Sequence, residues 1–223
     1  FENFDLSLDF YDIDITDGIN RFGVLQTAEM CVDSVSINNQ YCSQITRKAD
    51  GNISNVNDTY INSNQMIRRG LDVQAHYSHD FNNAGNLDLT LYATKLFEQS
   101  FTESDLAGAE TKDYVGINGS PEWKSSLITQ YSYQNLSLSW VMNYSHSAKY
   151  SLTATAEKYE KPIIPSSIIN NIRVNYDLND DAQVYLGVNN VGDKDWIGIP
   201  GVSKGTSAYP IYGRSYFAGV KYN

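Results

Sequence analysis

Histidine pairs and acidic triads are the residues that most often do chemistry, and this sequence offers few of either. His76 and His79 form an HxxH pair. On a β-strand, positions three apart face opposite sides, so these two side chains cannot share one metal ion. The third histidine, His146, has no nearby serine and carboxylate that would complete a catalytic triad. We therefore expect no metal site, no cofactor and no catalytic residue, and the chain is not expected to be an enzyme.

Two further segments could bind a cation or form a covalent link. The segment DGNISNVND (50–58) is rich in carboxylate and amide oxygens but lacks the glutamate that closes a calcium loop, so we interpret it as a polar turn. Cys31 and Cys42 lie eleven positions apart in an asparagine-rich stretch without CxxC spacing. In a reducing compartment they would be free thiols. In an oxidising one a disulfide would close a short loop and contribute roughly 2–3 kcal/mol.

The composition narrows the class of protein that must position these residues. The net charge of -10 argues against a nucleic-acid partner, because phosphate binding needs a basic face. The 223 residues include 17 Tyr, 8 Phe and 15 Gly, a mixture that suits β-strands with polar turns. No apolar run reaches the length of about 18 residues that a membrane helix needs. Strands of alternating polarity can still cross a membrane as a β-barrel.

Alternation of apolar and polar residues predicts eight β-strands. A period of two is typical of a strand with one apolar face. The predicted strands cover residues 4–15, 71–77, 87–93, 123–133, 136–144, 172–178, 184–188 and 213–223.

The connections between these strands alternate strictly between long and short. Long ones cover 16–65, 94–122, 145–168 and 189–211, and short ones lie at 78–86, 134–135 and around 179–181. A β-sandwich has no reason to alternate in this way, whereas an outer-membrane barrel has short periplasmic turns and long extracellular loops. The order of the long and short connections makes the last strand run toward the periplasm.

Tyrosines mark one end of the predicted strands. Tyr77, Tyr133, Tyr176 and Tyr222 each lie near the end of a strand that would run toward the periplasm. Such rings are stable at a membrane interface, so we expect them to form a lipid-interface belt. The alternative is that tyrosine is simply a good strand former.

Six segments, in order and spacing, resemble the C-terminal part of a TonB-dependent outer-membrane receptor. Each motif is weak alone, and their succession along the chain is what resembles the family. The segments are DFYDIDITDGI (9–19), CVDSVSINNQYC (31–42), RRGLDVQAHY (68–77), GSPEWKSSLITQYSY (119–133), VYLGVNNVGDKDW (184–196) and YGRSYFAGVKY (212–222). The cysteine-bearing segment resembles a loop of one receptor subgroup.

The resemblance implies an all-β fold, an antiparallel transmembrane β-barrel of 22 strands. Residues 1–223 would supply about eight C-terminal strands of the barrel domain, without the N-terminal plug and the earlier strands. The implied function is energy-coupled uptake of a scarce ligand, such as a siderophore, a vitamin or an oligosaccharide, across the outer membrane of a Gram-negative bacterium. Implied partners are outer-membrane lipid, that ligand, and a TonB-type energy-coupling protein contacted through the missing N-terminal region.

The long loops are the expected sites of ligand contact, because loops on a rigid scaffold carry recognition. Aromatic residues in them could stack on a flat ligand or a sugar ring, and packing within the loop is the alternative for each. The candidates are Tyr41, Tyr60, Trp196 and Tyr209. A disulfide between Cys31 and Cys42 would pin the largest loop. We also predict that an aromatic residue follows Asn223 directly, since the next lipid-facing position lies there.

Two other interpretations remain open from the sequence. Eight strands could form a complete small outer-membrane barrel acting as an anchor or adhesin, with the first strand paired to the eighth. The polar faces could instead meet solvent in a soluble, secreted, glycan-binding β-sandwich. Periodicity alone does not separate these alternatives.

Overall fold

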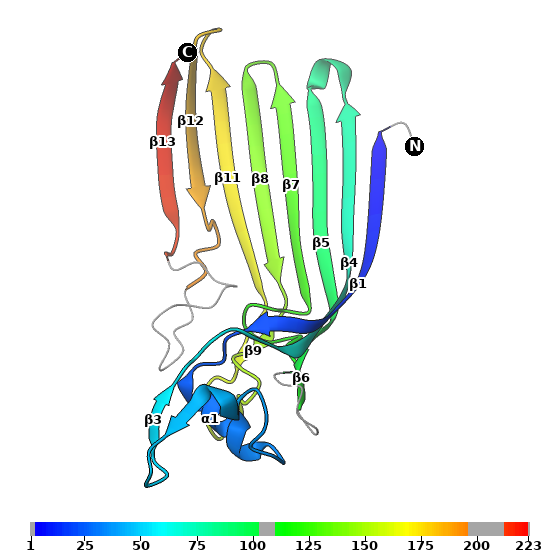
Figure 1. Cartoon of the computed structure of the whole chain (residues 1–223). Helices are drawn as coiled ribbons and strands as arrows, with labels where there is room; N and C mark the ends of the chain where they lie inside the picture. Colours follow the sequence, from blue (N-terminus) through cyan, green and yellow to red (C-terminus); the bar gives the residue numbers. More distant parts are fainter. Residues whose placement is uncertain (1–2, 103–109, 196–211, 223) are drawn as a thin grey trace. The chain divides into compact units, whose positions relative to one another are not determined.

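A computed structural model of the chain describes residues 3–102, 110–195 and 212–222. Figure 1 labels the helix and most of the strands. The chain divides into two compact units. The first, the wall unit, comprises residues 1–11, 69–97 and 114–223, and the second, the loop unit, comprises residues 12–68 and 98–113. Three strands contribute residues to both units.

One large sheet dominates the fold. Its strands follow the order β1-β4-β5-β7-β8-β11-β12-β13, with the short β6 added at β5, so neighbours in sequence are neighbours in space. From β5 to β13 each strand of this order pairs antiparallel with the next. The strands are β1 Phe4–Asn20, β4 Ile61–Asp80, β5 Asn86–Thr102, β6 Thr111–Asp113, β7 Trp123–Tyr133, β8 Leu136–Ser145, β11 Ser167–Asp177, β12 Ala182–Asn189 and β13 Ser215–Tyr222.

All eight predicted strands are present, and so is the alternation of long and short connections. The predicted range 123–133 coincides with β7. The prediction was too short for β1, β4 and β5, which have 17, 20 and 17 residues. The turn between β4 and β5 is consequently only residues 81–85, with the 3-10 helix η2 (Asn82–Ala84) inside it. The extra strand residues carry few apolar side chains, and several of these are adjacent, as in Met66-Ile67 and Leu96-Phe97, so no apolar alternation marks them in the sequence.

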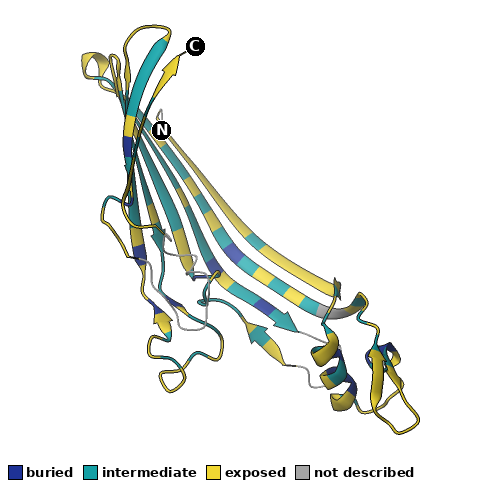
Figure 2. Cartoon of the chain, turned by 90° about the vertical axis from the view of Figure 1, so that its left-hand side faces the viewer, coloured by how far each residue is buried: buried dark blue, intermediate teal, exposed yellow. Residues whose placement is uncertain are grey.

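Cross-strand pairing gives the sheet one apolar and one polar face. Directly opposed pairs place apolar side chains on one face, and the intervening positions place polar side chains on the other. The apolar pairs include Leu127↔Met142, Trp140↔Ile172 and Val184↔Val220, whereas the polar pairs include Ser126↔Asn143, Gln130↔Ser139 and Ser137↔Asn175. In Figure 2 exposed (yellow) positions alternate with half-buried (teal) ones along several strands.

The four predicted belt tyrosines lie on the apolar face next to the short turns. Tyr77, Tyr133, Tyr176 and Tyr222 expose 37%, 38%, 48% and 78% of their surface. Trp123 marks the other end of the same face, where the Lys95 ammonium lies 5.0 Å from the centre of its ring. The strand from Trp123 to Tyr133 rises about 33 Å, or about 25 Å at the usual barrel tilt, which matches a membrane-spanning apolar band. Contact of these rings with lipid stays a prediction.

The sheet is open, which corrects two of the alternatives. Within the described residues β1 and β13 are both edge strands and do not pair with each other, so the prediction of a complete eight-stranded barrel is wrong for this structure. The other two sheets of the described residues, β2-β3 and β9-β10, have two strands each and cannot cover the apolar face as a sandwich requires. The strands are β2 Ile45–Arg47, β3 Ile53–Val56, β9 Ala148–Lys149 and β10 Ile163–Ile164.

The loop unit has a small core of its own around a disulfide. Helix α1 (Val24–Asp33) and the 3-10 helix η1 (Cys42–Gln44) are joined by the Cys31–Cys42 disulfide, which confirms the predicted pair. Met30, Cys31 and Tyr41 form its buried cluster. Asp58 fixes the start of the helix, because its carboxylate accepts hydrogen bonds from Arg21 Nε at 2.7 Å and from the Gly23 amide at 3.1 Å.

Candidate ligand-binding surface

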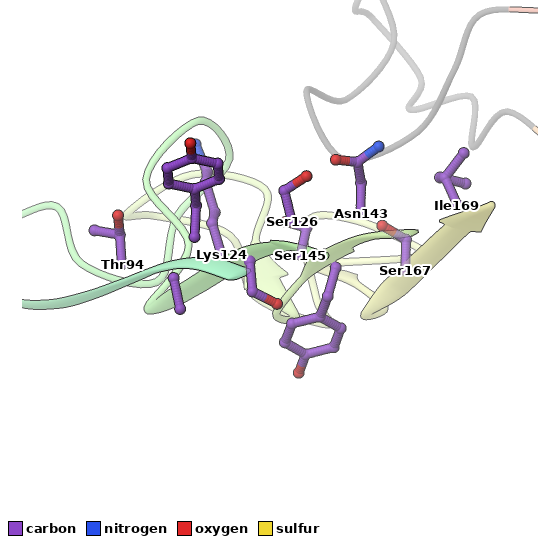
Figure 3. A pocket seen from close by; sticks show the side chains of 11 residues that line it. Thr94, Lys124, Ser126, Asn143, Ser145, Ser167 and Ile169 are labelled. Atoms are coloured by element: carbon purple, nitrogen blue, oxygen red, sulfur yellow. The ribbon is translucent and has the colours of Figure 1, made fainter. Parts of the chain in front are cut away.

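An open hollow of about 360 Å³ lies on the polar face of the wall unit, where β7, β8 and β11 approach their long connections beside the middle of β5. We call it the wall hollow. Figure 3 shows its labelled side chains, among them Thr94, Lys124, Ser126 and Asn143. Three strand registers bring these residues together from segments far apart in the sequence.

The lining side chains form two rows across the strands. In one row Thr94, Lys124, Ser145 and Ser167 are successive cross-strand partners. In the other, Tyr92, Ser126, Asn143 and Ile169 are successive partners. Neighbouring side chains within a row are about 4.8 Å apart, which is the spacing of strands in a sheet. The hollow is therefore an ordered array of polar groups with an aromatic ring at one end of the second row.

Lys124 is the one charged residue among the described residues that line the hollow. Its ammonium donates to the Gly119 carbonyl at 3.3 Å and remains exposed. On the next strand Thr94 donates from Oγ1 to the Asp72 carboxylate at 2.6 Å, so a negative charge lies beside the same row. The local charge is thus close to balanced, and the hollow is polar rather than strongly basic.

A second cluster on the polar face consists of aromatic rings that lie over glycines. The Arg173 guanidinium lies 4.4 Å from the centre of the Tyr185 ring, and the rings of Tyr185 and Phe217 are 6.3 Å apart. These rings lie against Gly219 and Gly187, their direct cross-strand partners, where a Cβ would collide with them. The glycines leave room for the rings over the sheet, so the rings pack across the pairing of β12 with β13.

The predicted loop contacts have different outcomes. Tyr41 has no exposed surface and packs in the core of the loop unit, with its ring 6.1 Å from that of Phe22. Its prediction as a ligand contact is corrected, because a fully buried ring cannot reach a ligand. Tyr60 is 71% exposed, and its role stays a prediction. Trp196 and Tyr209 lie outside the described residues.

The histidines lie as the strand geometry predicted. His76 Nδ1 is 3.1 Å from Thr90 Oγ1 on the polar face, whereas the His79 ring stacks with Tyr77 on the opposite face. The described residues contain no group of three or more His, Cys, Asp or Glu side chains that could hold a metal ion.

None of the helices in the described residues is long and apolar enough to span a membrane.

The segment 50–58 includes the turn between β2 and β3, as its composition predicted. Asp50 accepts hydrogen bonds from the backbone amide and then the side-chain amide of Asn52, each at 3.0 Å. These bonds hold the pKa of the Asp50 carboxyl below its usual value of 3.8. The carboxylate oxygens of Asp50 therefore stabilise the turn.

A family model for the β-barrel of TonB-dependent receptor-like proteins matches residues 1–191. The chain belongs to this family. TonB-dependent receptors are outer-membrane β-barrels of Gram-negative bacteria, so this chain is an outer-membrane protein, and its disulfide suits that oxidising location. The family consists of receptors and transporters rather than enzymes.

Solved TonB-dependent receptors share the fold of this chain at low sequence identity. The FrpB iron transporter from Neisseria meningitidis is 15% identical, with a TM-score of 0.59 over 99% of this chain and 29% of its own. The ferric enterobactin receptor PfeA from Pseudomonas aeruginosa, a mutant in complex with enterobactin, is 14% identical, with a TM-score of 0.62 over 100% of this chain and 29% of its own. A search of curated protein sequences gives no match.

This receptor chain thus spans about 29% of the length of the receptors it matches. The wall hollow is the feature that the sequence did not reveal. The alternating serines of β7 and β8 indicated a polar face. The serines of β7 and β8 become neighbours of Tyr92 and Ser167 only through strand pairing. That pairing joins strands that are separated in sequence by long connections.

Proposed function

We propose that the protein takes up a scarce ligand across the outer membrane by energy-coupled transport. The ligand classes expected from the sequence are a siderophore, a vitamin or an oligosaccharide. In this proposal the apolar face contacts lipid, and the polar face lines the passage. A TonB-type protein supplies energy through a region of the receptor outside these 223 residues.

The observation that carries the proposal is the family match over residues 1–191. The two-faced wall supports it, because a sheet that is apolar on one side and polar on the other suits a wall between lipid and an aqueous lumen. The solved neighbours named as an iron transporter and a ferric enterobactin receptor favour transport over a purely structural role.

The test is uptake by the native bacterium with and without the gene. Labelled ferric enterobactin, cobalamin and maltohexaose serve as probes for the three ligand classes. We expect the deletion strain to lose accumulation of one probe, and a plasmid copy to restore it. Accumulation should also stop when a protonophore dissipates the proton gradient.

A matched control uses a strain that lacks the energy-coupling protein but keeps the receptor. Binding of the probe to whole cells should persist in that strain while accumulation is lost. Accumulation that survives both the loss of the coupling protein and the protonophore would contradict energy-coupled uptake, and equal accumulation with and without the gene would contradict transport of these ligands altogether.

A further inference from the structure

The disulfide between Cys31 and Cys42 lies inside the core of the loop unit. Met30, Cys31 and Tyr41 form the buried cluster of that core, and Tyr41 has no exposed surface. The partly buried side chains packed against the cluster are Phe22, Cys42, Ile45 and Ile61. Both cysteines are therefore part of the core and not a clip at its edge. A core this small rarely stabilises a fold without a cross-link.

Helix α1 depends on contacts outside itself. It has ten residues, and isolated helices of this length are marginal in water. Its first turn carries no acidic side chain and its last turn no basic one, so charges do not favour its dipole. The Asp58 carboxylate holds its start by accepting from the Gly23 amide at 3.1 Å, and the disulfide holds its end through Cys31. Opening the disulfide removes the attachment at the end of the helix.

Asn39 brings Cys42 back toward Cys31 through local hydrogen bonds. Its Oδ1 accepts from the backbone amides of Tyr41 and Cys42, each at 2.8 Å. Its Nδ2 donates to Ser34 Oγ at 2.6 Å and to Cys42 Sγ at 3.3 Å. All of these groups lie within residues 34–42, so the turn forms from neighbours in sequence. The two cysteines are thus placed to find each other again after reduction.

Gln44 connects the disulfide to the segment that leads into β4. This residue ends η1, which begins at Cys42, and its side chain is buried. Its backbone carbonyl accepts from the Asn57 amide at 2.8 Å, and its Oε1 accepts from the Thr59 amide at 3.1 Å. Loss of η1 would leave these groups without their partners. The wall unit, in contrast, is held by its own pairing between strands.

We propose that the Cys31–Cys42 disulfide is a redox switch for the order of the loop unit. A dithiol reductant supplies two electrons and two protons to the bond, both cysteines become thiols, and the reductant becomes a disulfide. Residues 24–44 then unfold while the wall sheet persists, and oxidation restores them. This inference goes beyond the proposed function and does not rest on it, because it concerns the fold of one loop and not the ligand.

Cleavage by chymotrypsin at Tyr41 tests the switch in the full-length receptor in isolated outer membranes. The ring of Tyr41 is fully buried, so the site should be protected while the disulfide is intact. Dithiothreitol should raise the initial rate of cleavage after Tyr41 at least tenfold, as quantified by mass spectrometry against the boiled receptor. Heat-dependent gel mobility should stay unchanged, and transfer to oxidised glutathione should restore protection.

Three variants identify the cause of the change. The double variant Cys31→Ser, Cys42→Ser should be cleaved rapidly with or without dithiothreitol. Asp58→Ala lies away from the disulfide but weakens the start of α1. Because the fold and the disulfide stabilise each other, the bond in this variant should open at about tenfold less dithiothreitol. Glu29→Gln, an exposed change on α1, is the matched control and should alter neither value.

Four results would overturn the switch. They are a bond that dithiothreitol does not open, as maleimide labelling of the two thiols would show, and open thiols without faster cleavage at Tyr41. The others are faster cleavage together with loss of the heat-dependent mobility, and protection that does not return on oxidation. None of these results bears on energy-coupled uptake. Conversely, equal accumulation with and without the gene would refute the uptake proposal and leave the switch intact.

Discussion

At the scale of single residues, close packing on the polar face depends on positions that have no side chain. Tyr185 lies against Gly219 and Phe217 against Gly187, so each ring occupies the space where a Cβ would project. The same arrangement recurs where the Tyr11 ring covers Gly70. A ring packed over a glycine buries apolar surface against the neighbouring strand. Glycine in a strand thus marks a close approach here rather than a weak point.

Gly219→Ala is expected to destabilise the pairing of β12 with β13. The added methyl group would collide with the Tyr185 ring, and overpacking of this kind costs about 1–3 kcal/mol. Unfolding in urea, followed by the loss of heat-dependent gel mobility, measures the effect. Gly192→Ala is the matched control, because a Cβ there meets nothing within 4 Å.

A double variant identifies the cause of that loss. Removing the ring with Tyr185→Leu should restore much of the stability in the Gly219→Ala background, since the collision then disappears. Equal destabilisation by Gly219→Ala and Gly192→Ala would instead show that chain stiffness, and not the ring, sets the cost.

At the scale of elements, successive side chains of each strand point alternately to the apolar face and to the polar face of the sheet. On β7, Leu127 faces Leu91 and Met142 on the apolar face, whereas Gln130 faces Asp88 and Ser139 on the polar face. A shift of one residue would exchange the two sets. The register is therefore fixed by the demand that one face avoids water and the other accepts it.

Arginine substitutions on the two faces of β7 should have opposite consequences. Leu127→Arg places a charge on the apolar face near the middle of the strand and is expected to cost about 2–4 kcal/mol, as for arginine at the bilayer midplane. Gln130→Arg on the polar face should change stability little. The readouts are the amount of folded protein in outer membranes and its unfolding midpoint in lipid.

The comparison also tests which face meets lipid. A similar loss of stability in both variants would contradict the assignment of the apolar face to lipid. A greater loss of stability for Gln130→Arg would assign the polar face to lipid instead.

At the scale of the whole molecule, the described sheet leaves the outer edges of β1 and β13 unpaired. Unpaired backbone groups are costly in hydrocarbon, because no water is present to bond them. A closed barrel removes both edges. Strands in addition to those of this sheet are therefore needed for a stable wall, in keeping with solved receptors of which this chain covers 29%.

The native protein in isolated outer membranes should accordingly be several times larger than the 25.0 kDa of this chain. An antibody against residues 110–122 would detect it on a denaturing gel, and the band should shift on boiling as folded barrels do. A heat-dependent band near the size of this chain would contradict the need for further strands and, with it, the transport proposal.

The sequence by itself determined the strands of the wall and the face that each side chain takes. Alternation is a local property, and the contrast between lipid and water imposes it on each strand separately, so the ranges of β7 and β8 and the strand-based separation of His76 and His79 were predictable. For Cys31 and Cys42 the sequence left free thiols and a disulfide open, and only the resemblance to an outer-membrane receptor favoured the disulfide. The ends of β1, β4 and β5 were missed because their apolar residues are few or adjacent and leave no period of two.

Only the tertiary structure decided which distant residues meet. Tyr92, Lys124, Asn143 and Ser167 become neighbours through pairing between strands, and pairing depends on the relative register of segments joined by loops of very different length. Burial of Tyr41 is decided in the same way, because its ring is covered by a core that the chain assembles around the disulfide. The local sequence pattern specifies which face of a strand each side chain takes. A binding surface or a core is built from residues of several segments, so it depends on how those segments are arranged in space.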